Sequence, residues 1–284
     1  ERAWTKNFLH IAGGHNVTQM NDYLDYLADY EEIVEDVAYA GTVVKTFQQA
    51  SFSIQPQPEF DAYMNDGAAM ITLVGHSLGL DAWNFDIEEP EDYTNGDIDA
   101  FPFMFAGSCF VGDIHEFNQS TASMSERFVL ADDAGAIGFL ATVSFGFPQY
   151  LDVFCEDLYQ QFSNESYGQP LGYCMLETLN NIYVGDPNDT DYKGIKITSE
   201  EFTFQGDPAI ILAGSYQNPE YLVEYNAQTQ NIALFNPTTA TQIPAIGVSP
   251  ISIPSDLNEL DVLVTVNNIG KGVTTPYQVS VGYI

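Results

Sequence analysis

The sequence has very few basic side chains. Of its 284 residues, 7 are Lys or Arg and 40 are Asp or Glu, so the formal net charge is -33. A surface of this sign repels phosphate groups, which excludes nucleic acid and anionic lipid surfaces as partners. Hydrophobic residues make up 45% of the chain and aromatic residues 13%, too much for a disordered acidic tail. The acidic residues therefore coat a folded core, as suits a saline or extracellular setting.

Cysteines and long apolar runs are also scarce. Cys109, Cys155 and Cys174 are too few for a disulfide scaffold. The last two lie in expected helices, where they either pair or stay free. No run of about 18 apolar residues occurs, so we predict no membrane span. The chain begins at Glu1 without a signal-peptide pattern, and we expect a piece of a longer precursor.

Apolar runs and helical patterns alternate over residues 1–214. Strand-like runs occur at residues 6–12, 41–47, 69–75, 101–106, 134–142 and 208–212. Helical spacing occurs at residues 21–37, 58–65, 125–132, 150–162 and 170–182. This alternation predicts an α/β domain whose mostly parallel sheet is covered by helices on both faces.

Residues 215–284 have a different sequence pattern and form a second expected domain. Short strand-like segments occur at residues 222–225, 231–235, 245–249, 261–266 and 278–281. Pro, Asn and Gly separate them, and none has helical spacing. This pattern predicts a small all-β, Ig-like sandwich.

Two strand-like runs end in residues suited to catalysis. The run at 69–75 leads into His76 and Ser77, and the run at 101–106 leads into Cys109. Because the carboxyl ends of parallel strands form the functional edge of such a sheet, we expect His76 and Cys109 side by side. A thiol next to an imidazole suits a nucleophile and its general base. The backbone amides of Ser77 and Cys109 are candidates for an oxyanion hole. The alternative is structural, a buried Cys and a hydrogen-bonded His.

Two acidic loops are candidates for binding a structural Ca²⁺. The candidate ligands are Asp81, Asp86, Asp97 and Asp99 in the first loop, and Asp186, Asp189 and Asp191 in the second. Carboxylate oxygens are ligands that Ca²⁺ prefers. Neither segment fits the EF-hand pattern, and a solvated acidic loop is the alternative explanation for each.

The motifs and their order resemble the gingipain-like cysteine peptidases of the caspase-like clan. The matching segments lie at residues 9–14, 74–77, 102–114, 135–139 and 204–209. The resemblance covers about residues 4–213 and is closest to surface members of Bacteroidetes, including sortases of the type IX secretion system. It implies a caspase-like α/β/α sandwich, with Cys109 as the nucleophile and His76 as the general base of a thioester mechanism.

The sequence departs from the family pattern at two places. The family usually has His-Gly where this chain has His76 followed by Ser77. Gingipains also place an acidic residue after the first strand to orient the His. Here that segment ends in His15 and Asn16, so either the site is a plain dyad or one of these two residues orients His76.

The resemblance implies a secreted or cell-surface bacterial cysteine endopeptidase that acts on polypeptides. A sortase-like transpeptidase would use the same dyad, because only the acceptor of the acyl group differs. The alternative from another class is a catalytically inactive structural or adhesive surface protein with the same fold. Catalysis requires no cofactor, and a structural Ca²⁺ is the candidate ion. Other domains or fragments of the same precursor are expected partners.

Overall fold

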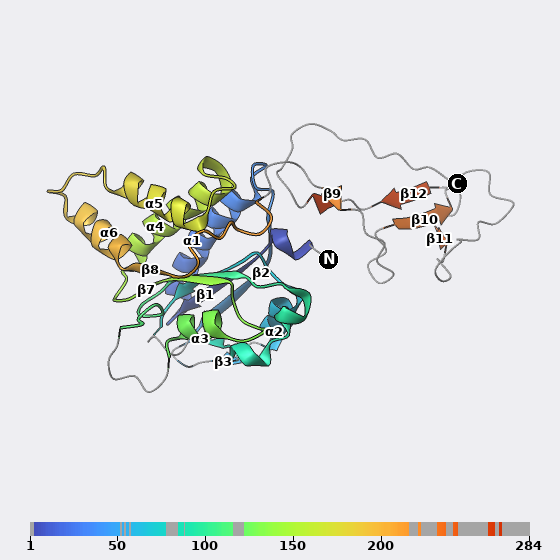
Figure 1. Cartoon of the computed structure of the whole chain (residues 1–284), viewed down its shortest axis with the longest axis horizontal. Helices are drawn as coiled ribbons and strands as arrows, with labels where there is room; N and C mark the ends of the chain where they lie inside the picture. Colours follow the sequence, from blue (N-terminus) through green and yellow to red (C-terminus); the bar gives the residue numbers. More distant parts are fainter. Residues whose placement is uncertain are drawn as a thin grey trace.

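The fold is built around one six-stranded sheet. This computed structural model describes residues 3–51, 53, 55–56, 58–77, 85–87, 89–115 and 122–215, with short strands at 221–222, 232–236, 241–243, 261–264 and 267–268. The strand order is β2-β1-β4-β6-β7-β8 (Figure 1). The six strands are β1 (Asn7–Gly14), β2 (Thr42–Ala50), β4 (Met70–Gly75), β6 (Phe103–Gly107), β7 (Gly138–Thr142) and β8 (Phe202–Gly206). All neighbours run parallel except β8, which is antiparallel to β7, so the prediction of a mostly parallel sheet is confirmed.

Helices cover both faces of this sheet (Figure 1). One face carries α1 (Val17–Glu35), α4 (Pro148–Gln160), α5 (Leu171–Ile182) and α6 (Thr190–Glu200). The other face carries α2 (Pro58–Asp66) and α3 (Met124–Leu130). The shorter elements are η1 (Ala3–Lys6), η2 (Pro90–Asp92), η3 (Asn95–Ile98), the π-helical η4 (Gln161–Glu165), and the paired strands β3 (Gln55–Pro56) and β5 (Phe85–Asp86).

Strand β1 shows why the central strands have largely apolar sequences. Its side chains alternate between two cores, because successive residues of a strand point to opposite faces. Phe8 and Ala12 belong to the core under α1 and α4, whereas Leu9 and Ile11 belong to the core over α2 and α3. A strand buried on both faces is therefore mostly apolar, and the buried His10 within β1 is hydrogen-bonded to the Tyr159 hydroxyl at 3.2 Å.

Helix α1 begins four residues earlier than its apolar spacing predicts. The spacing starts at residue 21, but the helix starts at Val17 because Asn16 caps it. The Asn16 side chain accepts a hydrogen bond from the backbone N–H of Gln19 at 3.0 Å. The first turn is therefore set by the cap rather than by apolar burial. This difference matters for the site, because Gln19 lies in that turn.

The prediction of a strand at 208–212 is wrong. The last strand of the sheet is β8, and the chain then turns after Gly206, where Ala209 N–H donates to the Asp207 carboxylate at 2.9 Å. Pro208 has no N–H to give to a sheet ladder. Ile210 and Leu212 still pack into the core, which explains the misleading apolar run.

Helix α6 and strand β7 also differ from expectation. Helix α6 has no strong apolar stripe in the sequence, and the capping residue Asp189 marks its start. The predicted strand at 134–142 begins only at Gly138, because Gly135 has a φ of 82° and turns the chain.

Only short strands are described after residue 220. They are β9 (Tyr221–Leu222), β10 (Ile232–Asn236), β11 (Thr241–Ile243), β12 (Asp261–Val264) and β13 (Asn267–Asn268). Their pairings are antiparallel, β10 with both β11 and β12, and β13 with β9. The strands predicted at 245–249 and 278–281 lie outside the described residues. Among the helices of the described segments, none has the length and apolar character needed to cross a bilayer.

Candidate active site

Three neighbouring strands end at the same edge of the sheet, and a candidate residue follows each of them. Strand β1 pairs with β4, and β4 pairs with β6, all in parallel. His15 follows β1, His76 follows β4 and Cys109 follows β6. The strand order therefore brings together residues that are far apart in the sequence.

The loop after β6 holds Cys109 in a defined position. The Ser108 hydroxyl donates to the backbone oxygen of Gly75 at 2.8 Å, which ties this loop to the end of β4. The Cys109 thiol donates to the backbone oxygen of Gly146 at 3.7 Å. Phe110 has a φ of 58°, a left-handed conformation that bulky residues rarely adopt. Strained residues of this kind concentrate at functional sites, so the loop is a candidate for one.

His76 is held on one ring face and at one ring nitrogen. The His15 ring stacks on it with the centroids 3.7 Å apart and an interplanar angle of 9°. The Nε2 atom of His76 lies 3.0 Å from Oε1 of Gln19. Tyr23 meets the ring edge-on at 6.1 Å. The ring is therefore fixed by α1 and by the residue after β1, while Asn16 acts as the cap of α1.

His76 and Cys109 line the same small cavity. Its volume is about 80 Å³, and it lies where β4 and β6 meet α1 and α4. The lining includes Gly75 and Gly107 at the strand ends, Gly146, three tyrosines, Asp152 and Cys155. All three cysteines of the chain are free thiols. Cys155 is fully buried, whereas Cys109 is partly exposed, so Cys109 is the more accessible thiol of the cavity.

The surroundings of Cys109 and His76 favour the neutral form of each side chain. Burial raises the pKa of the Cys109 thiol, and Glu201 raises it further, although the hydrogen bond with Gly146 opposes this. Burial lowers the pKa of His76, and the neighbouring His15 lowers it further. A neutral imidazole is able to accept a proton from a neutral thiol, so the arrangement suits general-base catalysis.

A carboxylate on α4 forms part of the cavity wall. The Asp152 side chain accepts a hydrogen bond from the Tyr30 hydroxyl at 2.7 Å. Burial raises the pKa of Asp152 to about 6, with further increases from Glu156 and Asp29, while the Tyr30 bond opposes the shift. At neutral pH, Asp152 is charged and only partly hydrated, a state that a cationic ligand would stabilise.

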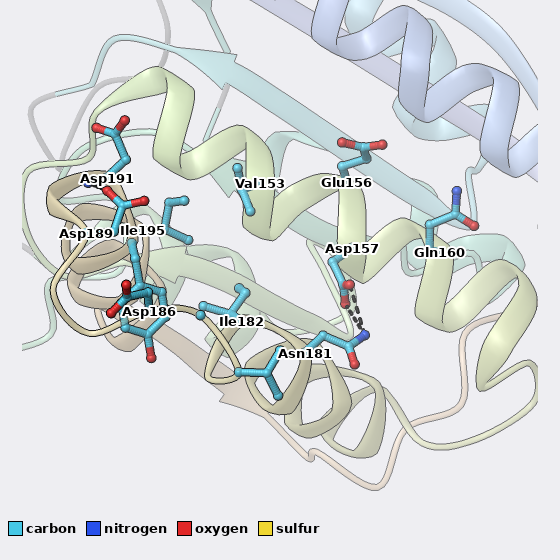
Figure 2. A pocket seen from close by; sticks show the side chains of 13 residues that line it. Val153, Glu156, Asp157, Gln160, Asn181, Ile182, Asp186, Asp189, Asp191 and Ile195 are labelled. Carbon is cyan, nitrogen blue, oxygen red and sulfur yellow. Dashed lines mark hydrogen bonds between the residues drawn. The ribbon is translucent and has the colours of Figure 1, made fainter.

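A larger hollow lies on the outer side of α4 and contains neither His76 nor Cys109 (Figure 2). Its volume is about 520 Å³, and Val153, Ile182 and Ile195 form part of its lining. The candidate calcium ligands Asp186, Asp189 and Asp191 lie on its rim (Figure 2). Because Cys109 and His76 both line the smaller cavity, that cavity is the candidate active site.

The candidate calcium ligands do not converge in the part of the chain that the structure describes. Asp186 accepts from the N–H of Asn188, Asp189 caps α6, and Asp191 accepts from a tyrosine hydroxyl. Asp97 lies in η3, and Asp99 ends it in a left-handed conformation. Within the described residues, no group of three or more His, Cys, Asp or Glu is placed to hold a metal. Asp81 and the Asp86 side chain lie outside the described residues.

Comparison with known proteins identifies the family. Residues 1–213 match the model of peptidase family C25. The chain belongs to peptidase family C25. This C25 chain is thus a cysteine-type peptidase by family, as its sequence motifs predict. No curated protein sequence matches it significantly.

Solved structures share the fold of this C25 chain. The crystal structure of the Arg-specific cysteine proteinase gingipain R has a TM-score of 0.52 and 16% identity, covering 95% of this chain and 68% of that one. The complex of Porphyromonas gingivalis RgpB pro- and mature domains has a TM-score of 0.52 and 14% identity, covering 94% and 69%. A third structure, described as a protease, has a TM-score of 0.56 and 12% identity, covering 95% and 68%. These similarities confirm the gingipain-type, caspase-like α/β fold.

Two residues of the candidate site, Gln19 beside His76 and Asp152 in the cavity wall, were not anticipated from the sequence. Gln19 contacts His76, and its position three residues after the Asn16 cap is the sequence signal that could have located it. Asp152 is one of many acidic residues, and nothing in its local sequence separates it from the others. Its place depends on the packing of α4 against α1.

Proposed function

We propose that this C25 chain is a cysteine endopeptidase in which Cys109 is the nucleophile and His76 the general base. The observation that carries the proposal is that both side chains line one cavity at the ends of adjacent parallel strands. The raised pKa of Cys109 and the lowered pKa of His76 favour a neutral resting pair. Proton transfer then accompanies attack rather than preceding it.

The reaction proceeds through a thioester. The His76 imidazole takes the thiol proton while the Cys109 sulfur bonds to the carbonyl carbon of the scissile peptide. The developing oxyanion is stabilised by the backbone amides of Ser77 and Cys109. The imidazolium protonates the leaving amine, and an acyl-enzyme remains. Water, deprotonated by His76, then attacks the thioester, which releases a carboxylic acid and restores the thiol.

The cavity favours a basic side chain at the residue before the scissile bond. Asp152 supplies the carboxylate, and Tyr23, Tyr26 and Tyr30 supply aromatic surface next to it. Carboxylates pair with cations, and aromatic faces attract them. The Arg-specific activity named for gingipain R is consistent with this preference.

The specificity is tested by comparing peptides that differ only at this residue. We expect kcat/KM to be highest for Arg or Lys, and Asp152→Asn to reduce it about tenfold or more for these peptides alone. Asp157→Asn is the matched control, because Asp157 lies on the same helix but lines the outer hollow. Equal cleavage of Ala and Arg peptides would contradict the preference.

The catalytic roles are tested with a peptidyl chloromethyl ketone that ends in arginine. We expect it to alkylate Cys109 and to react far more slowly with His76→Ala. His115→Ala is the control, because His115 is an exposed histidine beyond the nucleophile loop. Unchanged alkylation of His76→Ala would instead support the inactive structural protein.

Adding an amine such as glycine amide to the peptide assay separates hydrolysis from transfer, since a transpeptidase forms the amide product.

We also propose a secreted or surface location and a second, Ig-like domain at residues 215–284, after the catalytic domain at 1–214. The net charge of -33 suits a saline exterior. The antiparallel pairing of β10 with β11 and β12 suits a β-sandwich. Expression of residues 1–214 alone tests this division, and a folded, active fragment is the expected result.

A further inference from the structure

We propose that Gln19 is the positioning residue of His76 and fixes the tautomer in which Nε2 carries the hydrogen and Nδ1 is the base. This inference rests on the proposed function and deepens it. The side chain of Gln19 is in hydrogen-bond contact with the His76 ring. It reaches the ring from the first turn of α1 rather than from the loop directly after β1.

The backbone of His15 identifies which atom of the Gln19 amide faces His76. The His15 N–H donates to Oε1 of Gln19 at 2.9 Å. A backbone N–H only donates, so the atom it meets is the amide oxygen and not the amide nitrogen. The same oxygen lies 3.0 Å from Nε2 of His76.

The tautomer of His76 follows from this assignment. The Gln19 oxygen is only an acceptor, so Nε2 of His76 is the donor in their hydrogen bond. A neutral imidazole carries one hydrogen, which leaves the lone pair on Nδ1. The ring therefore presents Nδ1 as the atom that takes the Cys109 proton, while Gln19 retains the hydrogen on Nε2 in both charge states.

Gln19 is itself held in place. Its backbone N–H donates to the Asn16 cap at 3.0 Å, and Met20 N–H donates to the Asn16 backbone oxygen at 2.9 Å. Burial raises the pKa of Tyr23 to about 12, and a hydrogen bond with Gln19 partly opposes this rise. That bond is consistent with the amide nitrogen pointing towards Tyr23 and the oxygen towards His76.

A neutral amide orients the imidazole without adding a negative charge beside it. A carboxylate at this place would favour the imidazolium form of His76. The neutral amide of Gln19 does not, so burial and the neighbouring His15, both of which lower the pKa of His76, act without opposition from it. The titratable groups in contact with the ring are His15 and Tyr23, and those that line the same cavity are Tyr26, Tyr30, Cys109 and Asp152. Gln19→Glu adds a negative charge next to Nε2 of His76. It keeps an acceptor oxygen there, and Glu is also well suited to the first turn of a helix.

The first test reads the tautomer without requiring activity. ¹⁵N NMR of the imidazole nitrogens in a Cys109→Ala background should show Nε2–H and a bare Nδ1 for His76. The chain has four histidines, so the signal is assigned by its loss in His76→Gln. We expect a mixture of both tautomers in Gln19→Ala. Thr18→Ala is the matched control, because Thr18 is exposed in the same first turn of α1. A wild-type signal with hydrogen on Nδ1 would overturn the proposal.

The second test uses the pH profile of kcat/KM. Gln19→Glu should move the acidic limb to higher pH, because its carboxylate stabilises the imidazolium. Gln19→Ala should lower kcat about ten- to a hundredfold with little change in KM, the size of one charge-assisted hydrogen bond. An acidic limb that is the same in Gln19→Glu and wild type would overturn the proposal. If no peptide is cleaved while the NMR result holds, the proposed function fails and the positioning role stands.

Discussion

Replacing Asp152 by Asn should stabilise the protein at neutral pH. The carboxylate has a pKa of about 6 against an ordinary value of 3.8, mainly because burial disfavours its charge. That difference corresponds to about 3 kcal/mol for a fully shielded group. The group is partly exposed, and Tyr30 still donates to the amide oxygen of Asn, so we expect a gain of about 1–2 kcal/mol in the free energy of unfolding.

The pH dependence of this gain has a definite sign. Between pH about 4 and 6 the native state binds more protons at Asp152 than the unfolded state does, so this group lowers stability as pH rises through that window. Asn does not titrate. The advantage of Asp152→Asn should therefore be full above pH about 6.5 and vanish below pH about 4.

Urea unfolding at pH 7.5 and at pH 4, in a Cys109→Ala background that prevents self-digestion, measures both values. Asp25→Asn is the control for simply removing a charge from an acidic protein, because Asp25 is exposed on α1. A gain no larger than that of Asp25→Asn, or one equal at both pH values, would refute the reasoning. Under the proposed specificity the same substitution should lower cleavage after basic residues, so stability and activity towards these peptides should change in opposite directions.

Three further predictions follow from single contacts. A Cβ on Gly75 would stand 2.8 Å from the backbone oxygen of Gly13, so Gly75→Ala should cost about 1–3 kcal/mol in urea unfolding, and unchanged stability would contradict this. Ser123→Ala removes the capping box of α3 and should cost about 1 kcal/mol, most of which Ser123→Asp should restore; an equal loss in both variants would count against the cap. Burial raises the pKa of Cys109, so its alkylation by iodoacetamide should rise with pH through a midpoint above that of an unburied reference thiol, and a midpoint at or below the reference would argue against a neutral resting thiol.

The central strands and their catalytic candidates were predictable because each carries its own signal. A run such as residues 70–75 is apolar apart from Thr72, and a short run of this kind is typical of a strand buried on both faces. Once the strands are parallel, His76 and Cys109 must lie at one edge. This is why the candidate pair followed from the sequence.

The rest of the site depends on packing that no local pattern encodes. Gln19 was missed because the apolar spacing of α1 starts only at residue 21, whereas the cap starts the helix at Val17. Asp152 reaches the cavity only because α4 lies against α1, where Tyr30 meets it. The apolar run at 208–212 wrongly predicted a strand. Its apolar side chains pack into the core, but its backbone forms a turn rather than pairing with the sheet.

The order of the strands along the chain has a consequence for synthesis. Strands β1, β4 and β6 leave the ribosome in the same order in which they pair, so the histidine is made before the cysteine. The cavity closes only when α4 has packed on the sheet, late in the catalytic domain. No segment that ends before α4 contains the whole candidate site, so under the proposed function the chain would be unable to cut itself until α4 has packed on the sheet.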